Sequence, residues 1–516
     1  MANTHKSIRA HLKHLFSKPF YFVLFAIYPV LALLSYNISQ VHYTIGIRPL
    51  IVQTVAALAF FLLFRLLYRD WHRAAFATTI LSLLFYSYGH IYDSLYKKWG
   101  HFPHFAVWMF SIWAVLTILT LIWAALPKAR FNKAAFGLNV VSLGLTLVVT
   151  VQVLWWSLPY SHWAALNNST LVQTLRVPGG EMPPDIYYII MDSYGRADTL
   201  QAAYGYDNSD FVNSLTQMGF YVAECSQSNY ARTDFSLASS LNMNYVPNLD
   251  SDFTPEFRDP HPIWELLQHS AVRKMLENAG YKIVAFATGF GWSQLEDADV
   301  YLEPPPLFSD MTAFEAMLLQ TTPARHLTEF GLLNLDEITG MRYRERTLFT
   351  LDELAQLGSM PRPKFVFAHI IAPHPPFVFG ANGEKIDPAD YLLPTGLYST
   401  ESYRRGYLQA IPFINGELKR VLPQIIAKSA VPPIIILQGD HGAWALSYPQ
   451  RIQNLNAYYM PGHTAALYPS ISPVNSFRVV FNSYFGQDYP LLGDKSYSAP
   501  MQEIYNFSPV SYDCNK

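Results

Sequence analysis

The sequence predicts a membrane domain of five helices followed by one large α/β domain, an α/β/α sandwich with a mostly parallel sheet. Apolar runs of membrane-spanning length fill the first 156 residues. Beyond residue 184, short apolar runs typical of buried strands alternate with helical segments. The charges divide in the same place, because residues 1–155 hold 13 Lys and Arg against 2 Asp and Glu, and the remainder holds 23 against 36. This pattern indicates a basic apolar anchor joined to an acidic, water-soluble domain.

The composition excludes several classes of protein. Of the 516 residues, 51% are hydrophobic and only 14% are charged, whereas about 25% of the residues of a soluble protein are charged. A disordered chain and an ordinary cytosolic enzyme are therefore excluded. The acidic C-terminal part also argues against nucleic-acid binding, and its length is sufficient for one large hydrophobic core.

Five membrane spans are expected, since about 20 apolar residues cross a bilayer. They lie at about 19–38, 49–67, 73–91, 104–126 and 134–156. Basic residues gather before the first span, after the second and after the fourth: Lys6, Arg9, Lys13, Lys18, Arg69, Arg73, Lys128, Arg130 and Lys133. The positive-inside rule makes these ends cytoplasmic and places everything after residue 156 in the periplasm or outside the cell. No cleavable signal peptide is expected.

The predicted membrane spans contain few ionisable residues that could bind ions or catalyse a reaction. Arg65 is the ionisable residue inside a predicted span, and its position near the cytoplasmic end lets its charge reach the interface. A transport function is therefore disfavoured, and we expect residues 1–156 to serve as an anchor. A polar, turn-rich stretch at 157–183 is predicted to be a linker, and residues 184–516 form the outer domain.

The outer domain is predicted to contain a buried parallel sheet. The expected strands lie at 185–191, 281–287, 364–371, 433–438 and 477–482, and the longer helical segments at 262–279 and 403–428.

Ligand-type side chains stand where the predicted strands end. Asp192 follows the first strand, His369 and His374 accompany the third, and Asp440 and His441 follow the fourth. Open α/β sheets bind ligands at the carboxyl ends of their strands, so these residues are expected to meet. Asp440 and His441, adjacent in a tight turn, can both reach one divalent cation.

Each residue also has a purely structural interpretation. Asp192 would serve equally well as a helix N-cap, and His374 could be a packed surface residue instead of a substrate or phosphate contact. His369, inside a strand, suits a core residue or one that supports a metal ligand. His463, in the loop PGHTA, either lines the site or lies apart from it.

A hydroxyl nucleophile is expected nearby, because a metal lowers the pKa of a coordinated hydroxyl. The polar segment 225–242 supplies several. Thr233 falls near the start of a predicted helix, where free backbone N–H groups favour an anion, and Arg232 beside it could hold a phosphate oxygen. The hydroxyls of Ser228, Ser236 and Ser239 compete with Thr233 for the role of nucleophile.

The segments IIMDSYGRAD, NYART, APHPP and QGDHG, in this order and spacing, resemble the alkaline phosphatase superfamily and its sulfatase-like branch. With the membrane layout, the chain resembles lipoteichoic acid synthases and lipid A phosphoethanolamine transferases. The resemblance implies an alkaline phosphatase-like fold in which Asp192, Thr233, Asp440 and His441 bind a divalent metal, Mn, Zn or Mg. It further implies that Thr233 is the nucleophile, with Arg232 beside it, and that His374 binds substrate or protonates the leaving group.

Two departures from the family pattern bear on the reaction. The lipid-using transferases typically have Glu where this chain has Asp192, and Asp is typical of sulfatases and phosphatases. Sulfatases carry a C/S-x-P-x-R motif, and the sequence after Cys225 has neither the Pro nor the Arg. Sulfate ester hydrolysis is therefore disfavoured.

The expected function is metal-dependent transfer of a phosphoglycerol or phosphoethanolamine head group from a phospholipid to an envelope glycan or lipid acceptor. The alternatives are a membrane-anchored phosphodiesterase, phosphatase or sulfatase-like hydrolase, and a non-catalytic scaffold that binds glycans or proteins. The head group, the acceptor, a second metal and the oligomeric state stay open. Cys225 and Cys514 lie in a compartment where disulfides persist. The sequence is consistent with a disulfide between them and also with a free, buried Cys225.

Overall fold

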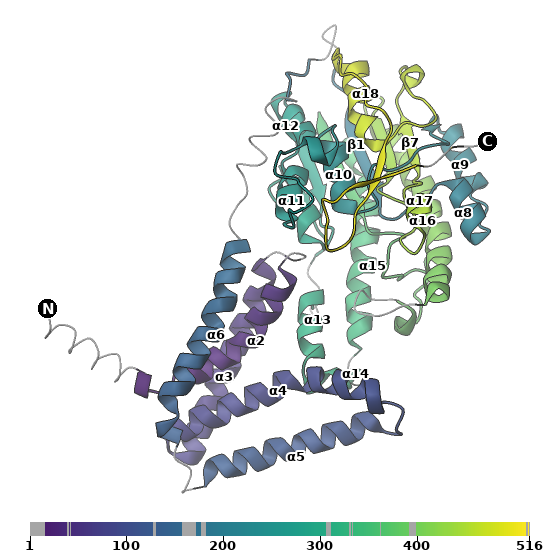
Figure 1. Ribbon diagram of the computed structural model, residues 1–516. Helices are drawn as coiled ribbons and strands as arrows, with labels where there is room; N and C mark the ends of the chain where they lie inside the picture. The colour runs from purple at the N-terminus through teal and green to yellow at the C-terminus, as the bar shows by residue number, and fades with distance from the viewer. Residues whose placement is uncertain are drawn as a thin grey trace, which may run out of the picture. The chain divides into compact units, whose positions relative to one another are not determined.

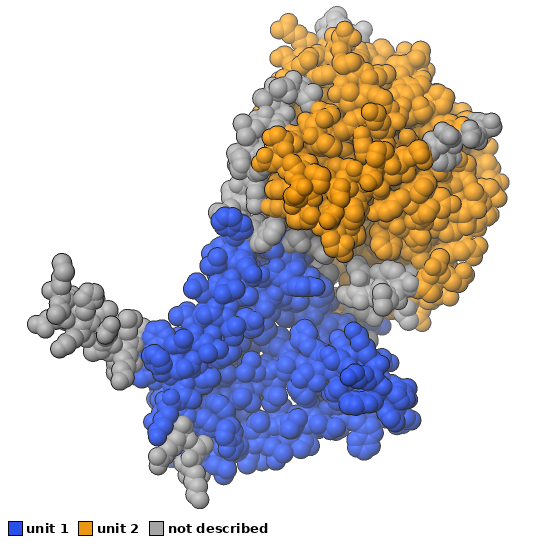
Figure 2. Space-filling model, in the orientation of Figure 1, with its two compact units in different colours: residues 1–159, 311–335 blue, residues 160–310, 336–516 orange. Residues whose placement is uncertain are grey.

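The architecture comes from a computed structural model of the whole chain. It describes residues 16–516 except 39–40, 42, 127–130, 157–171, 177–181, 306–310, 330–331, 333, 362, 392–398, 512–513 and 515–516. Most of the predicted linker 157–183 lies outside the described residues. The chain forms two compact units, one of residues 1–159 with 311–335, the other of residues 160–310 with 336–516 (Figure 2).

The first unit contains a helix at each of the five predicted spans (Figure 1). Four of its helices are long and apolar enough to cross a membrane, and the other, α2, has 17 residues. Their bounds are α2 Tyr21–Asn37, α3 Ile47–Tyr68, α4 Trp71–Trp99, α5 Phe105–Ala125 and α6 Ala135–Trp156. Many apolar side chains on α5 and α6 are exposed, as lipid-facing helices require.

Residues 311–335 belong to this first unit although they lie far along the chain. The segment comprises α13 (Ala313–Gln320), a 3-10 turn and α14 (His326–Glu329). Phe314 packs in one cluster with Leu34, Tyr86 and Val153, and the Gly89 N–H of α4 donates to the Thr321 carbonyl at 2.8 Å. Sequence patterns alone assign this segment to the outer domain, because the contacts that attach it to the first unit join residues far apart in the sequence.

The second unit is built on a seven-stranded sheet in the order β2-β7-β6-β1-β5-β3-β4. The strands are β1 Ile186–Met191, β2 Tyr221–Val222, β3 Lys282–Phe286, β4 Val300–Leu302, β5 Lys364–Ile370, β6 Ile434–Gly439 and β7 Asn456–Tyr459. The pairs that join β4, β3, β5, β1 and β6 are parallel, and β7 runs antiparallel to β6. The predicted mostly parallel sheet is confirmed.

Helices cover both faces of this sheet, which explains why its strands are continuously apolar. On one face, Tyr188 and Ile190 pack with α10 (Thr233–Leu241), α11 (His261–Gln268), α12 (Ala271–Asn278) and α18 (Pro473–Phe485). On the other face, Tyr187 and Ile189 pack with α8 (Ala197–Tyr204), α9 (Ser209–Gln217), α15 (Leu335–Leu354) and α16 (Thr400–Lys428).

Two sequence predictions about these elements were wrong. The expected strand at 477–482 is part of helix α18, whose Pro473 occupies the first turn. Its Phe477, Val480 and Phe481 are buried, so their helical spacing outweighs the strand preference of Val479 and Val480. The expected helix at 262–279 is two helices, α11 and α12, because the Ser270 side chain caps α12 by accepting from the Arg273 N–H.

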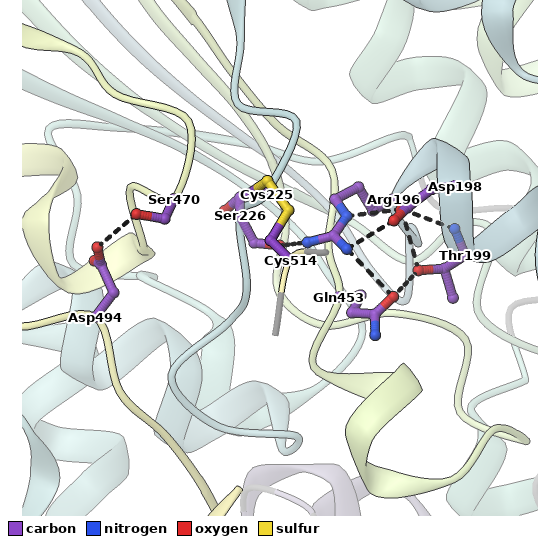
Figure 3. Close-up of a disulfide and its surroundings, with 9 residues drawn as sticks. All are labelled: Arg196, Asp198, Thr199, Cys225, Ser226, Gln453, Ser470, Asp494 and Cys514. Atoms are coloured by element: carbon purple, nitrogen blue, oxygen red, sulfur yellow. Dashed lines mark hydrogen bonds and ion pairs between the residues drawn. A yellow bond between two sulfur atoms is a disulfide. The ribbon is translucent and has the colours of Figure 1, made fainter. Parts of the chain in front are cut away.

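The end of the chain forms a second, two-stranded sheet of β8 (Ser496–Ser498) and β9 (Ser508–Val510). Beyond it, Cys514 is joined to Cys225 by a disulfide, with 5.7 Å between the two Cα atoms (Figure 3). Of the two states that the sequence allowed for Cys225, the structure has the bridge.

Candidate active site

The pairing of the central strands brings the predicted ligands to one edge of the sheet. Met191, at the end of β1, pairs with Ile370 of β5 and with Gly439 of β6. Asp192 and Asp440 are each the next residue along, so both lie just beyond the carboxyl edge. This is the convergence that parallel strands predict.

The turn after β6 needs glycine at two positions because backbone groups approach it closely. A Cβ on Gly439 would lie 2.2 Å from the Tyr194 carbonyl oxygen, and one on Gly442 would lie 2.7 Å from that of Gln453. Both neighbours are main-chain atoms, which cannot rotate away. Gly439 therefore lets the turn that carries Asp440 and His441 pack against the loop that follows β1, and Gly442 lets it pack against the segment that precedes β7.

Asp192, Asp440 and His441 form a buried cluster whose ligand atoms lie within 4.8 Å of one another. Their exposed fractions are 3%, 0% and 2%. Burial, and then the charge of Asp192, raises the pKa of Asp440. Burial opposes ionisation of Asp192 too, but His374, His369 and His441 together lower its pKa below the ordinary value. Two carboxylates so close together and out of water favour a bound cation.

Hydrogen bonds orient the ligand atoms of the cluster. The His441 Nδ1–H donates to the Gly442 carbonyl at 2.7 Å, which leaves the lone pair on Nε2, 3.3 Å from Asp440 Oδ2. Asp440 Oδ1 accepts from the Ser193 N–H at 2.8 Å, while Oδ2 has no hydrogen-bond partner among the described residues. A buried carboxylate oxygen without a partner, beside an imidazole lone pair, fits a divalent metal.

Of the four candidate hydroxyls, that of Thr233 lies beside the side chains of this cluster. It is the first residue of α10, and its Oγ1 lies 3.3 Å from His441 Nε2. The competing serines are bound to backbone carbonyls: Ser228 to Tyr230, Ser236 to Asp440 and Ser239 to Asn244. Of these four hydroxyls, Thr233 alone combines a place beside the ligand atoms with a position at a helix N-terminus, where an anion is stabilised.

Two histidines stand on the other side of Asp192, at the end of β5. His369 Nε2 lies 3.3 Å from Asp192 Oδ2, and its Nδ1 lies 3.3 Å from Ser293 Oγ. The His374 Nδ1–H donates to the Pro375 carbonyl at 2.6 Å, which leaves the lone pair on Nε2. His374 is half-buried and close enough to lower the pKa of Asp192.

The side chains of Arg232 and His463 contact other residues than those of the ligand cluster. The Arg232 guanidinium is paired with the Asp234 carboxylate at 2.7 Å and lies over the Phe235 ring. His463 follows β7, whose Tyr459 pairs with Ile435 at the start of β6. Because β7 is antiparallel to β6, His463 lies toward the opposite edge of the sheet, and its ring contacts Tyr484.

Some residues near the site could not be identified from the sequence. Ser193 adopts a left-handed backbone conformation with φ +66°, and its N–H positions Asp440. A pocket beside His369 is lined by Thr288, Tyr343 and Arg346, among others. An Arg in the middle of a helix such as α15 normally indicates a solvated face, so only the packing shows that Arg346 faces a pocket.

No protein-family model matches the sequence, and no curated protein matches it. Among solved structures, the chain is similar to the C-terminal periplasmic domain of EcEptC from Escherichia coli in complex with Zn. The identity is 12% and the TM-score 0.42, over 66% of this chain and 96% of that one.

Two further structures show the same kind of similarity. The soluble domain of lipooligosaccharide phosphoethanolamine transferase A from Neisseria meningitidis is 12% identical, with TM-score 0.36, over 59% of this chain and 88% of that one. A protein in the alkaline phosphatase superfamily from Vibrio parahaemolyticus is 10% identical, with TM-score 0.37, over 68% and 87%. These are among the protein groups that the sequence motifs resemble.

Proposed function

We propose that the protein is a metal-dependent membrane enzyme that transfers a phospho-head group from a phospholipid to a cell-envelope acceptor through a phospho-threonine. One observation carries the proposal: Thr233 Oγ1 lies at a helix N-terminus, 3.3 Å from the Nε2 of His441, beside a buried cluster of two carboxylates and an imidazole. A hydroxyl in such surroundings is suited to nucleophilic attack on phosphorus.

A divalent metal, Mn, Zn or Mg, would be held by Asp192, Thr233, Asp440 and His441. When bound, it lowers the pKa of a coordinated hydroxyl and offsets negative charge on a phosphoryl group. The carboxylate, hydroxyl and imidazole donors suit all three metals.

In the first step, Thr233 Oγ loses its proton to solvent and forms a bond to the phosphorus of the donor. The bond from phosphorus to the diacylglycerol oxygen breaks, and protonated His374 gives that oxygen a proton from Nε2. In the second step, the acceptor hydroxyl attacks the phosphorus and gives its proton to neutral His374. The bond from phosphorus to Thr233 Oγ breaks, and Thr233 Oγ takes back a proton from solvent. His374 thus acts first as acid and then as base.

The N-terminal helices fit this reaction because they would hold the site beside a lipid donor and raise its effective concentration. On this proposal the protein is a multi-pass protein of a bacterial-type inner membrane with its C-terminal domain outside the cytoplasm. The acceptor is an envelope glycan or lipid. The second candidate function is hydrolysis of the same esters, with a water molecule in place of the acceptor. It is favoured by Asp192, because Asp at this position is typical of the sulfatases and phosphatases that the motifs resemble.

The experiment is intact-mass spectrometry of the purified full-length protein after incubation with Mn²⁺ or Zn²⁺ and mixed phospholipids. We expect an adduct of phosphoglycerol or phosphoethanolamine on the wild type and none on Thr233→Ala. Ser239→Ala is the matched control, because it removes a hydroxyl from the same helix that bonds only to the Asn244 carbonyl. An adduct that persists in Thr233→Ala would refute the assignment of the nucleophile, and a bare phosphate adduct would indicate a phosphatase.

A further inference from the structure

One residue, Ser193, contacts both carboxylates of the ligand cluster. Its backbone N–H donates to Asp440 Oδ1 at 2.8 Å, and its hydroxyl donates to Asp192 Oδ1 at 3.1 Å. Ser193 is fully buried, so water does not compete for these bonds. One oxygen of each carboxylate is therefore fixed by the same residue, and the separation of the two side chains depends on where Ser193 is held.

Ser193 has an unusual backbone conformation that its neighbours must support. Its φ is +66°, in the left-handed region that residues with a Cβ atom seldom adopt. Rotation about φ moves the hydroxyl of this residue relative to its own N–H, so the two bonds to Asp192 and Asp440 depend on this conformation. Such a conformation persists where surrounding contacts enforce it.

Tyr407 of α16 supplies this support. Its hydroxyl donates to the Ser193 carbonyl at 2.8 Å and accepts from the Gly195 N–H at 3.2 Å. One oxygen atom thus binds the loop on both sides of Tyr194. Tyr407 is fully buried, and burial raises the pKa of its hydroxyl well above the ordinary value, so the hydroxyl keeps the proton that it donates.

A second tyrosine of α16 contacts the other turn that carries ligands. Tyr403 lies one helical turn before Tyr407, and the two rings stack with 5.7 Å between their centroids. The Tyr403 hydroxyl accepts from the Trp444 N–H at 3.0 Å, in the turn that begins with Asp440 and His441. Because residues four apart lie on the same face of a helix, one face of α16 holds the loop after β1 and the turn after β6.

We propose that Tyr407 is a positioning residue for the metal site. By holding Ser193, it sets the separation of Asp192 and Asp440 before a metal binds. The proposal rests on the proposed function, which assigns a divalent metal to these side chains. The bonds from Ser193 occupy Oδ1 of each carboxylate, and Asp440 Oδ2 has no hydrogen-bond partner among the described residues. Carboxylates already held in place bind a cation more tightly than mobile ones, because less conformational freedom is lost on binding.

Metal affinity can be measured directly and without turnover. The full-length protein in detergent is stripped of metal and titrated with Co²⁺, whose visible absorption depends on its ligands. Asp440→Asn identifies the part of the signal that comes from this site. Tyr407→Phe keeps the ring and removes the hydroxyl, and we expect it to weaken Co²⁺ binding about tenfold or more.

Tyr204→Phe is the matched control. The Tyr204 ring packs 5.5 Å from that of Tyr407, and its buried hydroxyl has no hydrogen-bond partner among the described residues. This variant should bind Co²⁺ like the wild type. Ser193→Ala is a second test variant, since it removes the hydroxyl bond to Asp192 and keeps the Cβ atom and the backbone N–H. It should also weaken Co²⁺ binding.

A tyrosine with only a structural role would lower the urea concentration at which the protein unfolds and leave the Co²⁺ affinity unchanged. The inference is overturned if Tyr407→Phe binds Co²⁺ as tightly as the wild type, or if Tyr204→Phe weakens binding as much as Tyr407→Phe does. If Tyr407→Phe does not fold, wild-type affinity in Ser193→Ala overturns it.

The same titration separates this inference from the proposed function. Weaker Co²⁺ binding by Tyr407→Phe, in a protein whose wild type forms no adduct on Thr233, would support the inference and count against the proposed function alone. An absence of Co²⁺ binding that depends on Asp440 would overturn both.

Discussion

Breaking the disulfide between Cys225 and Cys514 should destabilise the C-terminal unit by about 3–5 kcal/mol. The two cysteines are 289 positions apart, so in the unfolded chain the bridge closes a loop that spans most of this unit. Loop closure accounts for about 4.7 kcal/mol in a 100-residue loop, and a loop almost three times longer adds about 1 kcal/mol. Native disulfides usually contribute about 2–5 kcal/mol, so the entropic value is an upper limit.

The assay is a urea titration of the full-length protein in detergent micelles, in which a pulse of protease cleaves the unfolded fraction. Four samples are compared: the oxidised wild type, the wild type with dithiothreitol, Cys514→Ser, and Cys225→Ser with Cys514→Ser. The last three should unfold at the same lower urea concentration, since each lacks only the bridge. The reasoning is refuted if reductant leaves the midpoint unchanged, or if the native oxidised protein reacts with a thiol reagent.

Three other outcomes can be checked with similar means. Asp185→Ala should cost about 3–5 kcal/mol in the same titration, because it leaves the fully buried ammonium of Lys364 without its carboxylate. Asp185→Leu combined with Lys364→Met should recover most of that loss. Gly442→Ala should lower kcat at least tenfold, since its Cβ would push the turn that carries His441 off a backbone oxygen. Gly416→Ala, which has open space around it, should leave kcat unchanged. Removal of bound metal with a chelator should abolish the Thr233 adduct, and added Mn²⁺ or Zn²⁺ should restore it; an adduct that forms in the chelated protein would contradict a metal requirement.

The parallel core of the fold was predictable from the sequence because strands buried on both faces are apolar along their whole length. The runs that became β1, β5 and β6 are continuously apolar, and their shared direction places Asp192 and Asp440 at one edge without any knowledge of the packing. The same reasoning does not place His463. Its strand, β7, has four residues and runs in the opposite direction, so its end points away from that edge.

Other features depend on contacts that no local pattern contains. Val479 and Val480 favour a strand, but the segment forms helix α18 because its buried side chains contact the sheet at helical spacing. Among the four hydroxyl candidates, the sequence favoured Thr233 by its predicted place near the start of a helix and by the family resemblance of the NYART segment. The hydrogen bonds that occupy the three serines became visible only in the structure.

The division of the chain into its two units has a practical consequence for making a soluble enzyme. A fragment that begins at residue 160 would still contain residues 311–335, whose partners in the first unit would be gone. Phe314 and Leu318, which are 0% and 8% exposed in the whole protein, would then face water and favour aggregation. Replacing that segment with a short polar connection should give a better-behaved soluble fragment than truncation at the last membrane helix.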